Sequence, residues 1–196
     1  MATVGIIANP AAGKDIRRLV AHASVFDNNE KVNIVRRVLL GLEATGVQRV
    51  LVMPDYFGIG VKALHGLRLS LQVDSLEMPA EHSDVDSARA AVLMREAGVA
   101  CIVTLGGDGT NRAVAKGCGA VPLVPISTGT NNVFPVMIEG TVAGLAAGLV
   151  AQGVVDETEA VHPTLRLEIR RGDELVDIAL IDAVVYDGHF LGSRAI

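Results

Sequence analysis

The apolar residues of this chain occur in two patterns, short continuous blocks and longer segments in which they recur every three or four positions. A continuous block of β-formers is typical of a strand buried on both faces of a parallel sheet, whereas spaced apolar positions indicate an amphipathic helix. The blocks predict strands at 4–8, 50–53, 69–76, 99–105 and 121–126. The spaced segments predict helices that begin near 16 and that cover 28–44, 61–67, 83–98, 110–116 and 141–152. This alternation predicts an α/β fold in which helices pack on a parallel sheet.

The pattern changes near the end of the chain. Residues 165–170 alternate between apolar and polar, residues 171–174 (Arg-Gly-Asp-Glu) are typical of a hairpin turn, and residues 176–181 continue as a strand. Antiparallel β-structure that follows an α/β array indicates a second domain. We therefore divide the chain into an α/β domain at 1–157 and the beginning of a β-rich domain at 158–196.

A glycine-rich turn follows the apolar block at 99–105 and leads into a helical pattern that begins at Thr110. Gly106, Gly107 and Gly109 lack a Cβ, so the backbone can bring its amide groups close to an anion. The first turn of the following helix adds unpaired N–H groups and a partial positive charge. The stretch therefore predicts a phosphate cradle at the start of a helix.

One acid, Asp108, lies inside this cradle. Its negative charge would repel a phosphate, so its presence indicates a bound Mg²⁺ ion or the removal of a proton from a hydroxyl group. The alternative interpretation is that Asp108 caps the helix and that the glycines only allow a tight turn.

Two other predicted strands also end in polar loops. Residues 9–15 (Asn-Pro-Ala-Ala-Gly-Lys-Asp) do not form a P-loop, because the glycine spacing is wrong and Asp15 replaces the hydroxyl residue that would bind Mg²⁺. In the simplest interpretation of this loop, Asn9 bonds its own backbone. Ser127 to Asn132 are six consecutive small polar residues after the strand at 121–126. Ligands bind at this edge of open α/β sheets, so these hydroxyls and amides are candidate ligand contacts.

Two further patterns are weak signals of function. Gly58-Ile-Gly60-Val-Lys-Ala63 fits a relaxed dinucleotide-binding fingerprint, but residues 54–57 separate it from the preceding strand, so a loop that leads into a helix explains it better. His82-Ser-Asp-Val-Asp86 could ligate a metal, but Ser83 and the two aspartates suit the cap and first turn of the next helix. We interpret both patterns as structural.

Composition limits the classes of partner. Half of the 196 residues are hydrophobic and only 3% are aromatic, which predicts a core of Val, Leu, Ile and Ala. The net charge of −5 argues against a nucleic-acid partner, which would need a basic surface. The most hydrophobic long stretch, 141–155, contains three glycines and is shorter than the ~20 residues of a membrane span, so no membrane partner is expected. Cys101 and Cys118 lack metal-ligand spacing, and we interpret them as reduced packing residues of a cytoplasmic protein.

The sequence GGDGT at 106–110, at the end of a predicted buried strand, resembles the nucleotide-binding motif shared by the NAD kinases and the diacylglycerol and sphingosine kinases. Asn9-Pro-Ala-Ala-Gly13 resembles the first loop of this superfamily, which lies near the nucleotide phosphates. Residues 129–133 resemble the second nucleotide loop of the lipid kinases, GTGND, and differ from it at Asn131 and Val133. The resemblance implies a Rossmann-like, NAD kinase-like α/β domain, followed by a β-rich (β-sandwich) substrate domain that continues beyond residue 196.

The resemblance also implies roles for individual residues. Asp108 would be the catalytic base or a Mg²⁺ ligand. The NAD kinases begin their second domain with an Ala-Leu-Asn-Glu pattern, which is Ala179-Leu-Ile-Asp182 here, so Asp182 would bind the substrate and Ile181 replaces the asparagine. The residues that would hold the nucleotide or its phosphates are Asn9, Gly106, Gly107, Gly109, Thr110, Thr128, Gly129, Thr130, Asn131 and Asn132.

These observations support three hypotheses on function. The first is a NAD kinase-like phosphotransferase that uses ATP and Mg²⁺ and transfers the γ-phosphate to a hydroxyl of NAD or a related small molecule. The second is a nucleotide-binding regulatory protein without catalysis, motivated by Ile181 and the altered second loop. The third, a lipid kinase, is disfavoured because the sequence has no amphipathic helix with basic flanks for membrane binding. Exposed strand edges of an incomplete second domain further predict a homo-oligomer.

Overall fold

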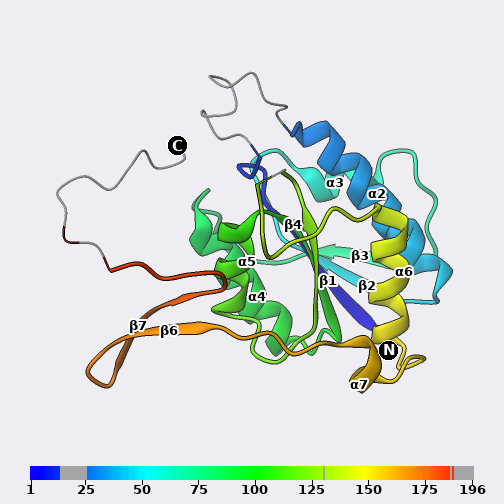
Figure 1. The fold of residues 1–196 in the computed structure, drawn as a ribbon. Helices are drawn as coiled ribbons and strands as arrows, with labels where there is room; N and C mark the ends of the chain where they lie inside the picture. Colours follow the sequence, from blue (N-terminus) through cyan, green and yellow to red (C-terminus); the bar gives the residue numbers. More distant parts are fainter. Residues whose placement is uncertain (14–25, 130, 186, 188–196) are drawn as a thin grey trace.

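The structure, a computed structural model, describes residues 1–13, 26–129, 131–185 and 187. Five parallel strands form one sheet in the order β3-β2-β1-β4-β5, which is the order of a doubly wound, Rossmann-like sheet (Figure 1). The strands are β1 (Thr3–Ala8), β2 (Arg49–Val52), β3 (Gln72–Ser75), β4 (Cys101–Gly106) and β5 (Leu123–Ser127). This arrangement confirms the predicted α/β fold with a parallel sheet.

Helices cover both faces of the sheet and enclose two apolar cores (Figure 1). One face carries α2 (Asn28–Ala44), α3 (Ile59–Leu64) and α6 (Gly140–Ala151), and the other carries α4 (Asp84–Glu96) and α5 (Asp108–Ala115). Strand β4, which lies between β1 and β5, is buried along its whole length, as its continuous apolar run predicted. Its side chains divide between the two cores: Val103 packs toward α2 and α6, and Ile102 packs toward α4.

Helices α2 and α6 pack with their backbones nearly in contact. A Cβ atom at Gly144 of α6 would lie 2.3 Å from the carbonyl oxygen of Val38 in α2. A Cβ atom at Gly41 of α2 would likewise lie 2.5 Å from the carbonyl oxygen of Thr141. The small residues of α6 therefore bring the two helices closer together than larger side chains would allow.

Two elements on the β3 side of the sheet differ from the prediction. β3 covers only Gln72–Ser75 instead of 69–76, and its side chains are at least partly exposed because it is an edge strand. α3 begins at Ile59, before the predicted start at Val61. The reason is the carboxylate of Asp55, which accepts hydrogen bonds from the amides of residues 57, 58 and 59 and so starts the helix earlier.

A short helix, α7 (Glu157–Ala160), was not predicted and lies across the expected domain boundary at 157. Its N-cap is Asp156, whose carboxylate accepts a hydrogen bond of 2.8 Å from the amide of Thr158. A four-residue helix is too short to leave a periodic apolar pattern in the sequence. The helix predicted to begin near Ile16, together with Lys14 and Asp15, lies outside the described residues.

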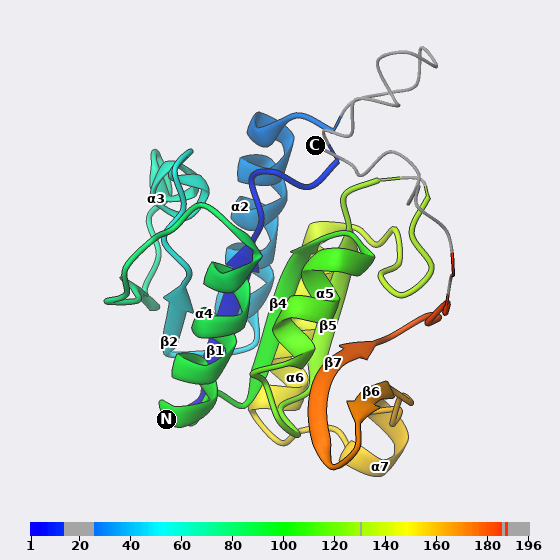
Figure 2. The ribbon, with the colours of Figure 1, turned by 90° about the vertical axis from the view of Figure 1, so that its left-hand side faces the viewer.

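The antiparallel segment predicted near the end of the chain is confirmed. β6 (Leu167–Arg171) and β7 (Glu174–Ala179) form a two-stranded sheet, and Gly172 takes a φ of +60° in the turn between them. This hairpin, which we call the β6–β7 hairpin, lies beside α5 (Figure 2).

The predicted packing role of the cysteines is also confirmed. Cys101 and Cys118 are free and buried, and burial raises the pKa of the Cys101 thiol to about 12. A thiol with so high a pKa stays protonated and unreactive near neutral pH. No helix in the described part of the chain combines the length and the apolar character that crossing a membrane requires.

Replacement of Gly144 by alanine tests the close approach of α2 and α6. In an exposed helix Gly→Ala would be favourable, but here the added methyl group meets the backbone of α2. We expect Gly144→Ala to lower the free energy of unfolding by about 1–3 kcal/mol in urea denaturation. Ala146→Ser, on the exposed side of the same helix, is the control and should change little. A Gly144→Ala protein as stable as wild type would contradict this packing.

Candidate functional site

The loops that follow β1, β4 and β5 meet at one end of the sheet, the upper end in Figure 2. Parallel pairing sets Ala8 beside Leu105 and Gly106 beside Ser127. The pairing continues past the strands, because the Asn9 amide donates to the Leu105 carbonyl at 3.0 Å and the Thr128 amide donates to the Gly106 carbonyl at 3.2 Å. Between β1 and β4 the chain switches direction along the sheet, and ligands bind at such switch points in open α/β folds.

Asn9 joins the first loop to the GGDGT segment. Its side-chain Nδ2 donates a hydrogen bond of 2.9 Å to the hydroxyl of Thr110. Its Oδ1 accepts one of 2.9 Å from the amide of Ala11, so the simple interpretation, that Asn9 bonds its own loop, is also confirmed. This side chain therefore adds to the backbone pairing that holds together two segments distant in the sequence.

A buried lysine that the sequence interpretation missed supports the first loop from below. Lys31 of α2 is fully buried, and its Nζ donates to the carbonyls of Asn9 at 2.8 Å and Ala12 at 2.7 Å and to Oδ1 of Asn28 at 3.0 Å. A signal was present, because Asn28 and Lys31 continue the buried stripe of Val35 along α2. Helical spacing alone does not say that a lysine in such a stripe points inward.

The GGDGT segment begins α5, and the first helical residue is Asp108 instead of the predicted Thr110. Gly107 is the N-cap, and the first hydrogen bond of the helix runs from the Asn111 amide to the Gly107 carbonyl at 3.1 Å. The amides of residues 108–110 precede that bond and have no partner within the helix. Among the described residues, no heavy atom would lie within 4 Å of a Cβ at Gly109, so this side of the turn is open.

The other two glycines of the motif make room for neighbouring side chains. A Cβ at Gly106 would lie 2.4 Å from the Cβ of Thr110, and a Cβ at Gly107 would lie 2.7 Å from Oδ1 of Asn132. Any larger residue at either position would displace a side chain that holds the loops together. These glycines are therefore required for packing as well as for the predicted approach of an anion.

Asn111 fastens the GGDGT turn to β4 and was not singled out from the sequence. It is fully buried, its Oδ1 accepts a hydrogen bond of 2.7 Å from the hydroxyl of Thr104, and its Nδ2 donates one of 3.0 Å to the Gly107 carbonyl. An asparagine in the first turn of a helix is usually assigned to the surface, which is why the sequence gives no sign of this role.

The carboxylate of Asp108 faces the second loop. Its Oδ1 accepts hydrogen bonds from the amides of Val133 at 3.0 Å and Phe134 at 2.8 Å, and its Oδ2 lies 3.2 Å from the Val133 amide. The interpretation of Asp108 as a helix cap is wrong, since Gly107 is the N-cap and no side chain caps α5. Asp108 is partly exposed and links the GGDGT turn to the loop after β5.

The second loop is braced by short side chains. The hydroxyl of Ser127 donates to the Gly129 carbonyl at 2.7 Å, and Nδ2 of Asn132 donates to the Ser127 hydroxyl at 2.8 Å. The Thr128 hydroxyl is buried and has no hydrogen-bond partner among the described residues. Asn131 is exposed, and Thr130 lies outside the described residues.

The remaining candidates are not part of the three loops. Asp182 is exposed and follows the end of β7 by three residues; no hydrogen bond joins it to the loops in the described part of the chain. The capping interpretation of residues 82–86 is confirmed, because Ser83 accepts from the Val85 amide and Asp86 accepts from the His82 amide. Within residues 1–13, 26–129, 131–185 and 187, no group of three or more His, Cys, Asp or Glu side chains could hold a metal ion.

A cavity of about 230 Å³ adjoins the first loop and shares Asn9 with it. It lies between the segments that follow β1, β2 and β3. The rings of Tyr56 and His82 meet edge to face at its rim, with centroids 5.6 Å apart. Burial raises the pKa of the Asp55 carboxyl, which also lines this cavity.

Two comparisons with known proteins agree with this geometry. The family model described as ATP-NAD kinase N-terminal domain matches residues 4–154, a range that holds the sheet and all three loops. The chain is also 46% identical to acetoin catabolism protein X of Cupriavidus necator H16 over 204 aligned residues. The alignment covers 98% of this chain and 57% of the relative, so the chain spans little more than half of that protein's length.

Replacement of Lys31 tests whether this side chain holds the first loop. Lys31→Met keeps most of the apolar stem and removes the ammonium group that binds the carbonyls of Asn9 and Ala12. We expect the free energy of unfolding to fall by about 1–3 kcal/mol, because the carbonyls of Asn9 and Ala12 and Oδ1 of Asn28 lose a charged hydrogen-bond donor. We also expect hydrogen exchange of residues 9–13 to accelerate. Lys62→Met, on α3, serves as the control. Unchanged exchange in the loop of the Lys31→Met protein would show that Lys31 does not anchor it.

Proposed function

The chain belongs to the ATP-NAD kinase family, and on that premise we propose that it is a phosphotransferase that moves the γ-phosphoryl group of ATP to a hydroxyl of NAD or a related small molecule. One observation carries this proposal. The start of α5 is open at Gly109, and it lies between two polar loops that Asn9 and Asp108 tie to it. Because the chain spans 57% of its relative, the proposal concerns the activity of the full-length protein.

The α5 N-terminus suits the phosphates of the nucleotide. The amides of residues 108–110 precede the first helical hydrogen bond and carry the positive end of the helix dipole. The hydroxyl of Thr110 is held in place by Asn9. We propose that Gly107, Gly109 and Thr110 contact phosphate oxygens and that Asn9 keeps the neighbouring loop in register with them.

The second loop offers an unused hydrogen-bonding group. The buried Thr128 hydroxyl has no partner among the described residues, and an unpaired buried hydroxyl costs about 1–3 kcal/mol. The Thr128 amide is bonded to Gly106, so this hydroxyl lies next to the cradle. We propose that a polar atom of the bound nucleotide or acceptor forms a hydrogen bond with the Thr128 hydroxyl. Asn131 and Asn132 would help to orient the same ligand.

The residues present also fit a Mg²⁺ ion, which the family implies. Mg²⁺ is commonly bound by one or two carboxylates together with substrate phosphates, and Asp108 supplies one carboxylate at the mouth of the cradle. When bound, the ion would neutralise phosphate charge. In the alternative role that we propose for Asp108, its carboxylate accepts the proton of the acceptor hydroxyl as the hydroxyl oxygen attacks the γ-phosphorus and ADP leaves.

The hydrogen bonds to the second loop leave part of the Asp108 carboxylate available for this task. A carboxylate has about four lone-pair sites; the amides of Val133 and Phe134 bind Oδ1, the Val133 amide also lies near Oδ2, and one site of Oδ2 remains. These bonds orient the carboxylate of Asp108.

By similarity to the relative, whose name refers to acetoin catabolism, we propose that the protein serves acetoin catabolism. We also propose that Asp182 belongs to the acceptor site.

A nucleotide-binding regulatory protein without catalysis is the second candidate. Two observations favour it: the Asp108 carboxylate is bonded to loop amides, and Ile181, which cannot form the side-chain hydrogen bonds of an asparagine, precedes Asp182. Such a protein would bind ATP and NAD without converting them. A turnover assay beside a binding assay distinguishes the two candidates.

Asp108→Asn in the full-length protein tests the proposed proton acceptor. Asparagine keeps an oxygen that can accept from the amides of Val133 and Phe134 but lacks the basicity of a carboxylate. We expect kcat for NADP formation to fall about 10²- to 10⁴-fold, with the ATP dissociation constant from calorimetry changed only a few-fold.

The control is Asp173→Asn, the same change at an exposed position in the turn of the β6–β7 hairpin. It should leave both quantities at their wild-type values. Normal turnover of the Asp108→Asn protein would exclude Asp108 as the base. A wild-type protein that binds ATP but forms no NADP would favour the regulatory candidate.

A further inference from the structure

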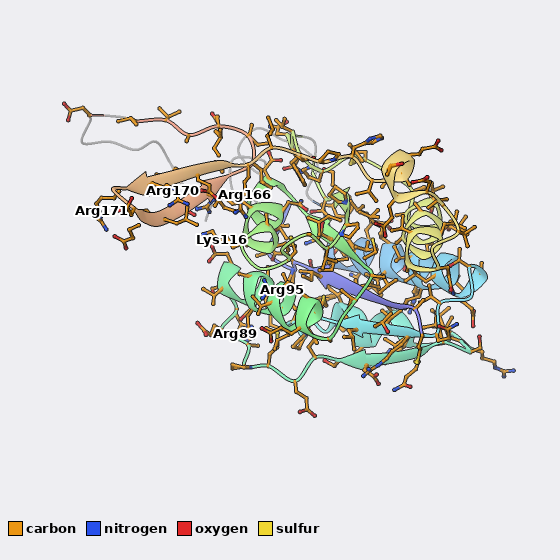
Figure 3. All side chains as sticks on the ribbon, turned by 90° about the horizontal axis from the view of Figure 1, so that it is seen from below. Arg89, Arg95, Lys116, Arg166, Arg170 and Arg171 are labelled. Atoms are coloured by element: carbon orange, nitrogen blue, oxygen red, sulfur yellow. The ribbon has the colours of Figure 1, made fainter. Side chains whose placement is uncertain are left out.

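One ionic cluster joins the β6–β7 hairpin to α5. Nε of Arg112 donates a hydrogen bond of 2.7 Å to the carbonyl of Ile178, and the Arg112 guanidinium also pairs with the carboxylate of Asp177. Nζ of Lys116, the C-cap residue of α5, lies 2.8 Å from the same carboxylate. Figure 3 shows Lys116 beside the hairpin, with Arg170 and Arg171 farther out along it. We call Arg112, Lys116 and Asp177 the α5 clamp.

The clamp is charged and directional. The hydrogen bond from Lys116, that from the Ile178 amide and the charge of Arg112 together lower the pKa of the Asp177 carboxyl to about 2. The three side chains are about one-third exposed, at 33%, 38% and 34%, so salt screens their attraction in part. The fork of Arg112 adds geometry that a simple ion pair lacks, since it holds a carboxylate and a backbone carbonyl at once.

Little else holds the hairpin against the sheet domain. Within β6 and β7, only Ile178 and Ala179 are buried. A two-stranded hairpin is marginally stable by itself in water, so its position depends on the elements to which it is fixed. The clamp and these two adjacent residues therefore determine where β7 lies.

Helix α5 thus connects the proposed phosphate cradle at its start to the residues that hold the β6–β7 hairpin. Asp108 is its first residue, Arg112 follows one turn later and Lys116 follows its last turn. At a rise of about 1.5 Å per residue, Asp108 and Arg112 are only ~6 Å apart along the axis. On the hairpin side, β7 leads within three residues to Asp182. A change in how α5 holds β7 would therefore move the start of the second domain relative to the cradle.

We propose that Arg112, Lys116 and Asp177 are positioning residues that set the acceptor-binding part of the second domain, beginning at Asp182, against the phosphate cradle of α5. They would touch neither substrate. This inference rests on the proposed phosphotransferase function for its kinetic consequences. Reacting atoms tolerate little misplacement, and an error of about 1 Å can cost ~10²-fold in rate.

The proposal predicts a specific split between the two substrates. ATP binding is made by the cradle and the loops around it, which do not include the clamp. Loosening the clamp should therefore raise KM for NAD about tenfold and lower kcat, while the ATP dissociation constant stays within about twofold of wild type. A general loss of folding would instead weaken both.

The test uses the full-length protein with Asp177→Asn and Arg112→Gln, singly and together. Arg112→Lys keeps the charge but loses the fork, and it should recover part of the NAD affinity. If the two residues act as one unit, the double variant should have a KM for NAD no higher, and a kcat no lower, than the more impaired of the two single variants. Arg171→Gln, which breaks the exposed pair with Glu174 at the outer end of the hairpin, is the matched control.

Hydrogen exchange supplies a readout that does not need turnover. Amides of residues 174–179 should exchange about tenfold faster in Asp177→Asn and in Arg112→Gln, and at the wild-type rate in Arg171→Gln. Unchanged exchange in the clamp variants would overturn the clamp. Faster exchange with unchanged KM and kcat for NAD would overturn the positioning role and leave the clamp as a purely structural contact.

The same measurements distinguish a failure of the clamp proposal from a failure of the proposed phosphotransferase function. A wild type without turnover whose clamp variants still show faster exchange and weaker NAD binding by calorimetry would overturn the phosphotransferase and support the clamp. A wild type that neither turns over nor binds NAD would overturn both.

Discussion

The pairing of β4 with β1 on one side and β5 on the other is the constraint on which the site depends. In both pairs the hydrogen bonds continue past the ends of the strands, through the amides of Asn9 and Thr128. The turn after β4 therefore receives one polar loop on each side, at the point where the chain changes direction along the sheet. The three loops form a single surface because backbone pairing leaves them no other arrangement.

Buried polar side chains then determine the shape of that surface. Backbone groups in loops at a sheet edge must be paired, and the apolar cores on either face of the sheet cannot pair them. Lys31, Asn111 and Ser127 do so from α2, α5 and β5 respectively. The hydrophobic cores thus set the layers, whereas a network of buried donors and acceptors sets the conformation of the loops.

Asp108 joins the start of α5, which packs against the sheet, to the second loop. The negative charge of Asp108 is compensated by the positive end of α5 and by hydrogen bonds from two loop amides. The same helix holds the β6–β7 hairpin through Arg112. α5 is therefore the element through which the first loop, the second loop and the β6–β7 hairpin are related to one another.

The amino-acid sequence alone determined the layers of the fold and placed the glycine-rich GGDGT turn at the end of a buried strand. Burial on both faces gives the strands of the parallel sheet continuous apolar blocks, and burial on one face gives helices a period of about 3.6. These patterns, like the glycines of GGDGT, are properties of neighbouring residues. The sequence could not indicate that Asn9 would contact Thr110 or that Lys31 would point inward. It also could not indicate that Asp108 would accept hydrogen bonds from the amides of Val133 and Phe134. Only the tertiary structure decided these contacts, because strand order and register bring together residues that are far apart along the chain.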